Sequence, residues 1–237
     1  MYFMTKKILN QNDIINTEIA NSYDLDCIFS DNPINRVKNE PLVKNKNDEL
    51  NKLKKKIQNI ENCELKVNAS KLVFADGNID SLIMIVGEGP GQKEDELGKP
   101  FVGEAGILLN KMLKAINVNR KNTYVTNVVN FRPPGDRKLK SSEITKYSNF
   151  LRDHISIIDP KILVLMGSTA MESLLGSKIK ISKERGNWKE VIINNKTYLT
   201  MITFHPAYLL RQADQKKYSW EDLKKIRKKI DELGINF

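Results

Sequence analysis

The stretch LIMIVGEGPGQKED, residues 82–95, joins a continuous apolar run to a loop of glycine, proline and carboxylates. The run Leu82–Val86 is typical of a strand that is buried on both faces of a parallel sheet. The turn that follows would place polar side chains at the carboxyl end of this strand, where α/β proteins commonly bind ligands. A second apolar run, Tyr198–Phe204, leads into His205 in the same way. We therefore expect both strand ends to border one pocket.

Outward from this stretch, strand and helix patterns alternate along the chain. Further strands are predicted at residues 123–128, 162–166, 191–193 and 198–204, and helices at 104–116, 141–158, 168–175 and 219–233. The helix at 104–116 carries its apolar side chains at i, i+3 and i+4 spacing, so it would cover one face of a sheet. This alternation predicts an α/β fold: a three-layer α/β/α sandwich around a central, mostly parallel sheet of four to five strands.

The first 62 residues differ from the rest because they are polar and rich in Asn and Lys. Short helices are expected at residues 8–20 and 47–60, joined by a mobile linker at about 31–46. We interpret residues 1–62 as a helical N-terminal extension and residues 63–237 as one domain.

The chain of 237 residues has a formal net charge of +10, and the excess is unevenly distributed. Residues 1–62 hold ten basic and nine acidic side chains, whereas residues 63–237 hold 29 and 20. A basic excess in the predicted domain suits a protein that binds a phosphate backbone. A Lys-, Asn- and Ile-rich composition that reflects genomic nucleotide bias would give a similar charge, so charge alone does not decide.

Membrane and secretory classes are disfavoured by the same composition. No apolar run approaches the roughly 20 residues that span a bilayer. The first residues lack the apolar core of a signal peptide. We expect a cytoplasmic protein without membrane association.

Two side chains at predicted strand ends have chemistry that suits a ligand. Asn127 offers an acceptor and a donor side by side, which would match an amide-like edge of a base. It could instead merely terminate its strand. His205 emerges where Pro206 stops a strand, and a neutral imidazole there could donate a hydrogen bond to developing negative charge. The alternative for His205 is a half-buried structural histidine.

Two further candidates lie in loops. Glu88 and Glu94 share the loop after the first strand, where an acidic, solvated loop is the competing interpretation. Phe101 lies between Gly98 and Gly103, and would be either a core aromatic or a platform on which a base stacks. The glycines of the 87–91 turn match neither G-x-G-x-x-G nor G-K-[ST], so a nucleotide-binding Rossmann domain is a weak alternative.

Five segments together resemble the family 4 (type-4) uracil-DNA glycosylases in order, spacing and content. These segments are Gly87–Asp95, Gly98–Gly103, Thr126–Arg137, Arg185–Trp188 and His205–Arg211. The resemblance implies a monofunctional uracil-DNA glycosylase, which hydrolyses the N-glycosidic bond of uracil in DNA and leaves an abasic site for base-excision repair. The alternative is a module of the same fold that recognises uracil or damaged DNA without turnover.

The resemblance also implies roles for individual residues. The expected uracil-binding set is Glu88, Gly89, Phe101, Asn127 and His205. Glu94 and His205 are the expected catalytic residues, with Glu94 nearest the sugar and the attacking water. Gly89 departs from the family, which more often has alanine at this position.

We expect this protein to act as a monomer and to bind DNA. The candidates for DNA contact are Arg132, Arg137, Arg185, Tyr208, Leu209 and Arg211. Guanidinium groups on short loops suit phosphates, and Tyr208 or the pair Leu209–Leu210 could enter the gap that a flipped base leaves. Taken singly, these residues could equally be surface charges or buried aliphatic side chains.

Family 4 enzymes usually resemble one another in a four-iron–four-sulfur cluster held by four cysteines. In this chain Cys63 is the only matching ligand position, because Ile60, Phe131 and Tyr147 stand at the other three. The whole chain has two cysteines, Cys63 and Cys27. We therefore expect no cofactor and no metal, with apolar packing in the place of the cluster, each burial worth roughly 1.5–3 kcal/mol.

Overall fold

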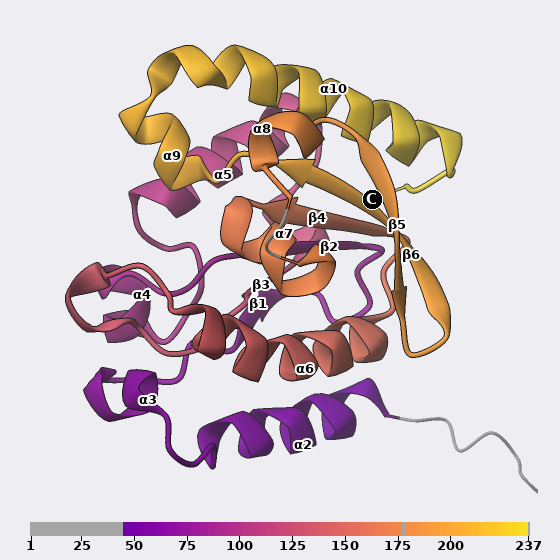
Figure 1. Ribbon diagram of the computed structural model, residues 1–237. Helices are drawn as coiled ribbons and strands as arrows, with labels where there is room; N and C mark the ends of the chain where they lie inside the picture. Colours follow the sequence, from indigo (N-terminus) through magenta and orange to yellow (C-terminus); the bar gives the residue numbers. More distant parts are fainter. Residues whose placement is uncertain (1–44, 177–178, 237) are drawn as a thin grey trace, which may run out of the picture. The chain divides into compact units, whose positions relative to one another are not determined.

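Six strands form one sheet in the computed structural model, which describes residues 45–176 and 179–236 (Figure 1). The strands are β1 (Ala75–Gly77), β2 (Ile83–Gly87), β3 (Tyr124–Asn127), β4 (Ile162–Met166), β5 (Trp188–Ile193) and β6 (Lys196–Thr203). Their order across the sheet is β1-β3-β2-β4-β6-β5. The four central strands run parallel, and β1 and β5 pair antiparallel at the two edges.

Helices connect and cover these strands. The described helices are α2 (Lys46–Gln58), α3 (Glu64–Asn68), α4 (Gln92–Leu97), α5 (Glu104–Ala115), α6 (Ser141–Ile158), α7 (Ser168–Leu175), α8 (Ile181–Glu184), α9 (Pro206–Arg211) and α10 (Lys216–Glu232), with short 3-10 turns η1 (Arg120–Asn122), η2 (Pro134–Asp136) and η3 (Ala213–Gln215). The predicted α/β class, with a mostly parallel sheet between helical layers, is confirmed. The expected number of strands was too low, because β1 has only three residues and shows no readable periodicity.

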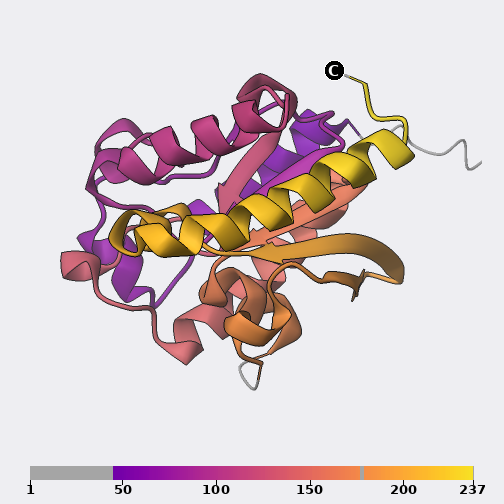
Figure 2. The same cartoon turned by 90° about the horizontal axis from the view of Figure 1, so that it is seen from above.

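The three layers follow from the alternation of apolar side chains along buried strands. On β2, Ile83 and Ile85 join the apolar cluster beneath α5 and α10, whereas Met84 and Val86 join the cluster beneath α6 and α7. Figure 2 shows α5 and α10 lying across one face of the sheet. Both faces of the central strands are therefore buried, as a continuous apolar run predicts.

Helix α2 is the part of the expected N-terminal extension that the structure describes. Its buried side chains Leu50, Leu53 and Ile57 belong to the same apolar cluster as Tyr147 of α6. The helix predicted at residues 8–20 and nearly all of the predicted linker lie outside the described residues. A division of the chain at residue 62 stays a prediction.

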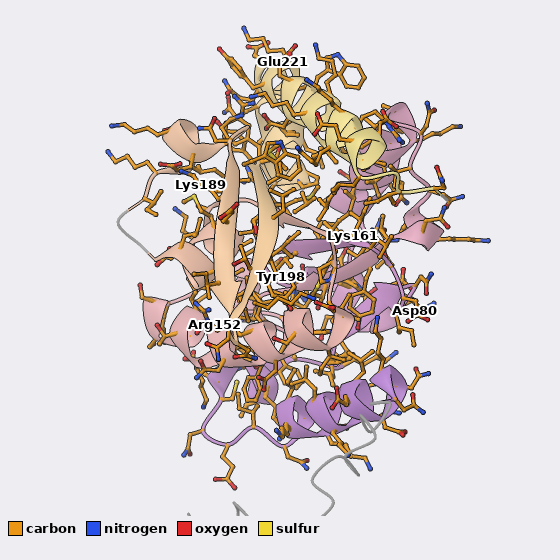
Figure 3. The ribbon with its side chains drawn as sticks, turned by 90° about the vertical axis from the view of Figure 1, so that its right-hand side faces the viewer. Asp80, Arg152, Lys161, Lys189, Tyr198 and Glu221 are labelled. Carbon is orange, nitrogen blue, oxygen red and sulfur yellow. The ribbon has the colours of Figure 1, made fainter. Side chains whose placement is uncertain are left out.

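The β5–β6 edge of the sheet faces the viewer in Figure 3, with Lys189 and Tyr198 on its strands and Arg152 on α6.

Across the described ranges 45–176 and 179–236, none of the helices combines the length and the apolar character that crossing a membrane requires.

The strand ends meet at one edge of the sheet. Gly87 at the end of β2 is the register partner of Asn127 at the end of β3. Met166 at the end of β4 is the partner of Thr203, two residues before His205. Because these strands are parallel, the loops that follow them converge on the same side.

Candidate functional site

A pocket of about 790 Å³ opens at the carboxyl ends of the parallel strands. Most of the residues predicted from the sequence line it, namely Glu88, Gly89, Glu94, Phe101, Asn127, Arg137, His205, Tyr208 and Arg211. They come from loops that lie far apart in the chain. The parallel topology brings them together, as the sequence predicted.

Asn127 contributes a buried acceptor to this pocket. The residue is 3% exposed, and its Oδ1 has no hydrogen-bond partner among the described residues. Leaving a buried polar atom unpaired costs roughly 1–3 kcal/mol, so such atoms call for an explanation. A ligand that presents a donor at this point would satisfy the atom.

Gly87 allows this acceptor and an aromatic ring to approach each other. A Cβ on Gly87 would lie 2.5 Å from Oδ1 of Asn127 and 2.4 Å from the ring of Phe101. Both contacts are far shorter than real Cβ contacts, so only glycine fits. The ring and the amide therefore border the same small space.

Phe101 is held in an unusual backbone conformation, with φ at 54°. The residue is 5% exposed, and the centroid of its ring lies 5.6 Å from that of His205, in a stacked arrangement. Phe101 also packs in the apolar cluster beneath α5. Phe101 thus belongs to the core and also lines the pocket, and its role as a platform on which a base stacks stays a prediction.

His205 is the N-cap of α9, and its Nδ1 accepts a hydrogen bond from the backbone N–H of Ala207 over 3.2 Å. This bond leaves Nε2 to carry the proton of a neutral ring. Burial, together with the positive charge of Arg211, lowers the pKa of His205 to about 4 from its ordinary 6.5. The pocket therefore contains a neutral imidazole whose available group is an N–H donor.

Glu94 is fixed by the backbone of the loop that carries Phe101. Its Oε1 accepts hydrogen bonds from the N–H of Val102 at 2.9 Å and of Gly103 at 2.7 Å. The neighbouring Asp95 is buried and accepts from the N–H groups of Ser70 and Lys71. Two adjacent carboxylates thus have defined backbone partners, which does not match a solvated acidic loop.

Glu88 and Gly89 form the wall next to Asn127. A Cβ on Gly89 would lie 2.8 Å from a methyl group of the buried Val129. Alanine at this position would require Val129 to move. The glycine is therefore matched to its neighbour in this chain.

The predicted DNA contacts fall into two groups. Arg137 and Arg211 line the pocket, and Arg132 pairs with Asp136 at 2.8 Å on the adjoining η2 turn. Arg137 is also held by Glu143 at 2.7 Å. Arg132 itself does not line the pocket, whereas its partner Asp136 does.

Arg185 and Leu209 are placed differently. The guanidinium of Arg185 forms an ion pair with Asp222, a fully buried carboxylate on α10, and lies over the Phe204 ring. Leu209 is 1% exposed within the apolar cluster, so its side chain cannot enter DNA in this conformation. Tyr208 lines the pocket and packs against Phe204 with ring centroids 5.0 Å apart.

Other lining residues were missed from the sequence. Gly167 and Ser168 follow β4, and a Cβ on Gly167 would lie 3.0 Å from that of His205. The signal was available, because Gly167 directly follows the predicted strand at 162–166 and so had to reach the same sheet edge.

Comparisons with known proteins show the family to which the chain belongs. A family model described as the uracil DNA glycosylase superfamily matches residues 74–225. The chain belongs to this superfamily. It is 38% identical over 175 residues to the type-4 uracil-DNA glycosylase of Thermotoga maritima, covering 73% of this chain and 90% of that protein. It is also 38% identical over 188 residues to that of Sulfurisphaera tokodaii (76% and 84%), and 32% identical over 183 residues to that of Archaeoglobus fulgidus (76% and 92%). The resemblance to family 4 is confirmed.

These relatives correct the prediction about cofactors. Type-4 uracil-DNA glycosylases are iron–sulfur enzymes, so the expectation of a protein with no cofactor is wrong as it stands. The residues at the ligand positions nevertheless do not fit a four-thiolate cluster. Cys63 lies 3.4 Å from the hydroxyl of Tyr147, and Ile60 and Phe131 are buried in the same apolar cluster. Within the described ranges, no group of three or more His, Cys, Asp or Glu side chains could hold a metal. Cys27 lies outside those ranges.

Proposed function

We propose that this chain is a monofunctional uracil-DNA glycosylase, which hydrolyses the N-glycosidic bond of uracil in DNA and leaves an abasic site that initiates base-excision repair. The observation that carries the proposal is the buried Oδ1 of Asn127, which has no hydrogen-bond partner among residues 45–176 and 179–236. This atom lies beside Phe101 in a pocket that also contains a neutral His205. The relatives named type-4 uracil-DNA glycosylase support the same activity.

In this proposal Asn127 reads the Watson–Crick edge of a flipped base. Its Oδ1 accepts from N3–H of uracil, and its amide nitrogen donates to O4. Cytosine has an acceptor at N3 and a donor at C4, so the same fixed amide rejects it. Phe101 supplies the stacking face, and Glu88 and Gly89 contact the ring from the adjoining wall.

His205 stabilises the leaving group. Negative charge develops on uracil as the bond to the sugar breaks, and Nε2–H of the neutral imidazole donates a hydrogen bond to O2. The bond from Ala207 to Nδ1 supports this role because it fixes the tautomer that donates toward the pocket.

Glu94 acts on the sugar side. A carboxylate opposite the oxocarbenium-like sugar lowers the energy of the transition state, and the same group orients the attacking water. The N–H groups of Val102 and Gly103 hold Oε1 and thereby set the direction of the second oxygen.

We also propose that the protein acts as a monomer and binds single- or double-stranded DNA. Arg132, Arg137 and Arg211 would contact phosphates, and Tyr208 would occupy space near the flipped base. Arg185 and Leu209 would support this surface from behind, given their contacts with Asp222 and the apolar cluster. We further propose residues 63–237 as the glycosylase domain behind an N-terminal extension, and retain the cytoplasmic location expected from the sequence.

The test is an excision assay with an oligonucleotide that contains one uracil, followed by alkaline cleavage of abasic sites. We expect strand cleavage that depends on the protein, and none with a cytosine-containing oligonucleotide. Binding of the uracil strand without any abasic product would overturn the proposal in favour of a recognition module without turnover.

A further inference from the structure

Arg120 lies behind the pocket and uses all five of its N–H donors on neighbouring groups. Nε and Nη2 donate to Oδ2 of Asp76 at 3.2 and 3.1 Å, and Nη2 donates also to the carbonyl oxygen of Pro100 at 2.7 Å. Nη1 donates to the carbonyl oxygen of Phe101 at 3.0 Å and to Oδ1 of Asn110 at 3.3 Å. A guanidinium group has five donors in a planar fork, so this set leaves none unused.

Two of these bonds hold consecutive carbonyl groups of the loop that carries Phe101. This loop needs support, because a φ of 54° is unfavourable for a bulky residue. Its backbone is also pressed against α5, where a Cβ on Gly106 would lie 1.8 Å from the carbonyl oxygen of Phe101. The surroundings therefore impose a conformation that Phe101 would not adopt alone.

The charge of Arg120 is balanced at the edge of the sheet. Its side chain is 16% exposed, and Asp76 lies on the edge strand β1. The guanidinium thus connects the Phe101 loop to β1. Strand β1 in turn pairs with β3, which ends in Asn127. The ring and the amide are positioned relative to each other through this connection.

We propose that Arg120 is a positioning residue for base capture, which holds the Pro100–Phe101 backbone so that the Phe101 ring stands against the flipped base beside Asn127. This inference rests on the proposed function, because its measurement is uracil excision. Arg120 does not line the pocket and acts only through Phe101.

The test is a double-mutant cycle on the second-order rate constant for uracil excision under single-turnover conditions. Arg120→Ala should lower this constant about tenfold or more, since it removes charge-assisted hydrogen bonds to two carbonyl groups. Phe101→Ala should lower it by at least as much. In the Phe101→Ala background, Arg120→Ala should then cost less than about twofold, because residues that act as one unit are not additive.

Arg227 provides a matched control. It also pairs with an aspartate, Asp231, and donates to a backbone carbonyl, that of Ile116, but it does not line the pocket. Arg227→Ala should leave the rate constant within about twofold of wild type in both backgrounds. If Arg120→Ala does not fold, Arg120→Lys carries the cycle, since it keeps the charge but not the planar fork.

The outcomes separate the two claims. A wild-type chain that excises no uracil overturns the proposed function. An active wild type with an equally active Arg120→Ala variant overturns only the positioning role. Additive losses in the double variant, with a lowered melting temperature, would mean that Arg120 merely stabilises the fold and would also overturn it.

Discussion

The backbone N–H of Ala207 donates to Nδ1 of His205, a residue that lines the pocket, and this single bond assigns the proton of a neutral ring to Nε2. Because Pro206 is the first residue of α9, the imidazole serves as the N-cap of the helix and cannot turn without losing that contact. The histidine is therefore oriented in advance of substrate binding.

A pH prediction follows from the lowered pKa of His205, about 4. The unfolded chain takes up this proton near pH 6.5 and the folded chain only near 4. The stability that depends on the neutral ring is therefore present above about pH 6.5 and is lost progressively as the pH falls toward 4. We expect the imidazole to stay neutral, with its proton on Nε2, from pH 7 to 5.

The chain has only two histidines, so nitrogen-correlated NMR spectra can follow both. His154 is an internal control, because burial lowers its pKa to about 3. A side chain at position 205 that titrates near pH 6.5, or that carries its proton on Nδ1, would contradict the proposed donor role.

Asn127→Asp should weaken uracil excision by about tenfold to a hundredfold or more, since a carboxylate keeps the acceptor for N3–H but loses the donor to O4. The measurement is the single-turnover rate on a uracil-containing oligonucleotide. Asn130→Asp is the control. The buried amide of Asn130 donates to the carbonyl groups of Val73 and Phe74, so loss of this amide should lower the melting temperature and leave the excision rate unchanged. Unchanged excision by Asn127→Asp would remove the residue from the site.

Glu94→Gln should lower the chemical rate by roughly a hundredfold or more while leaving affinity for uracil-containing DNA nearly intact, because the charge acts on the transition state. The amide oxygen can still accept from Val102 and Gly103, so the loop should keep its shape. Glu96→Gln, on the exposed face of the same helix, should excise at the wild-type rate. If Glu94→Gln also excises uracil at the wild-type rate, Glu94 is not the catalytic carboxylate, and Glu88 becomes the candidate.

Arg211→Ala should weaken DNA binding about equally for all sequences and reduce the slope of log K against log salt by about one unit. Titrations at several salt concentrations, read by fluorescence anisotropy, measure this slope. Lys161→Ala is the matched control, since Lys161 precedes β4 at the opposite end of the strands (Figure 3). An equal change of slope in both variants would mean that binding is not localised at the pocket.

The sequence was most informative where chemistry follows a buried strand. Asn127 lies near the end of one predicted strand and His205 directly follows another, and this was enough to assign both to one pocket, because parallel strands end at the same edge of a sheet.

Long-range partners could not be predicted in the same way. Arg185 looked like a DNA contact, but its partner Asp222 lies 37 residues further along the chain, on α10. Leu209 looked like a wedge, whereas the turn of α9 directs it into the apolar cluster. Arg120 gave no signal at all, because its use depends on Asp76 and the Phe101 loop meeting around it.

The Oδ1 atom of Asn127, which finds no partner in the described part of the chain, has a consequence for the released base. A molecule that satisfies this atom binds the folded chain and not the unfolded one, so it shifts the folding equilibrium by mass action. Free uracil should therefore raise the melting temperature of the protein in proportion to the logarithm of its concentration, whereas cytosine, with no donor at N3, should not. The product of excision, free uracil, would then stabilise the folded protein that released it. Dissociation of uracil from the pocket would set the time before the next uracil in DNA can bind.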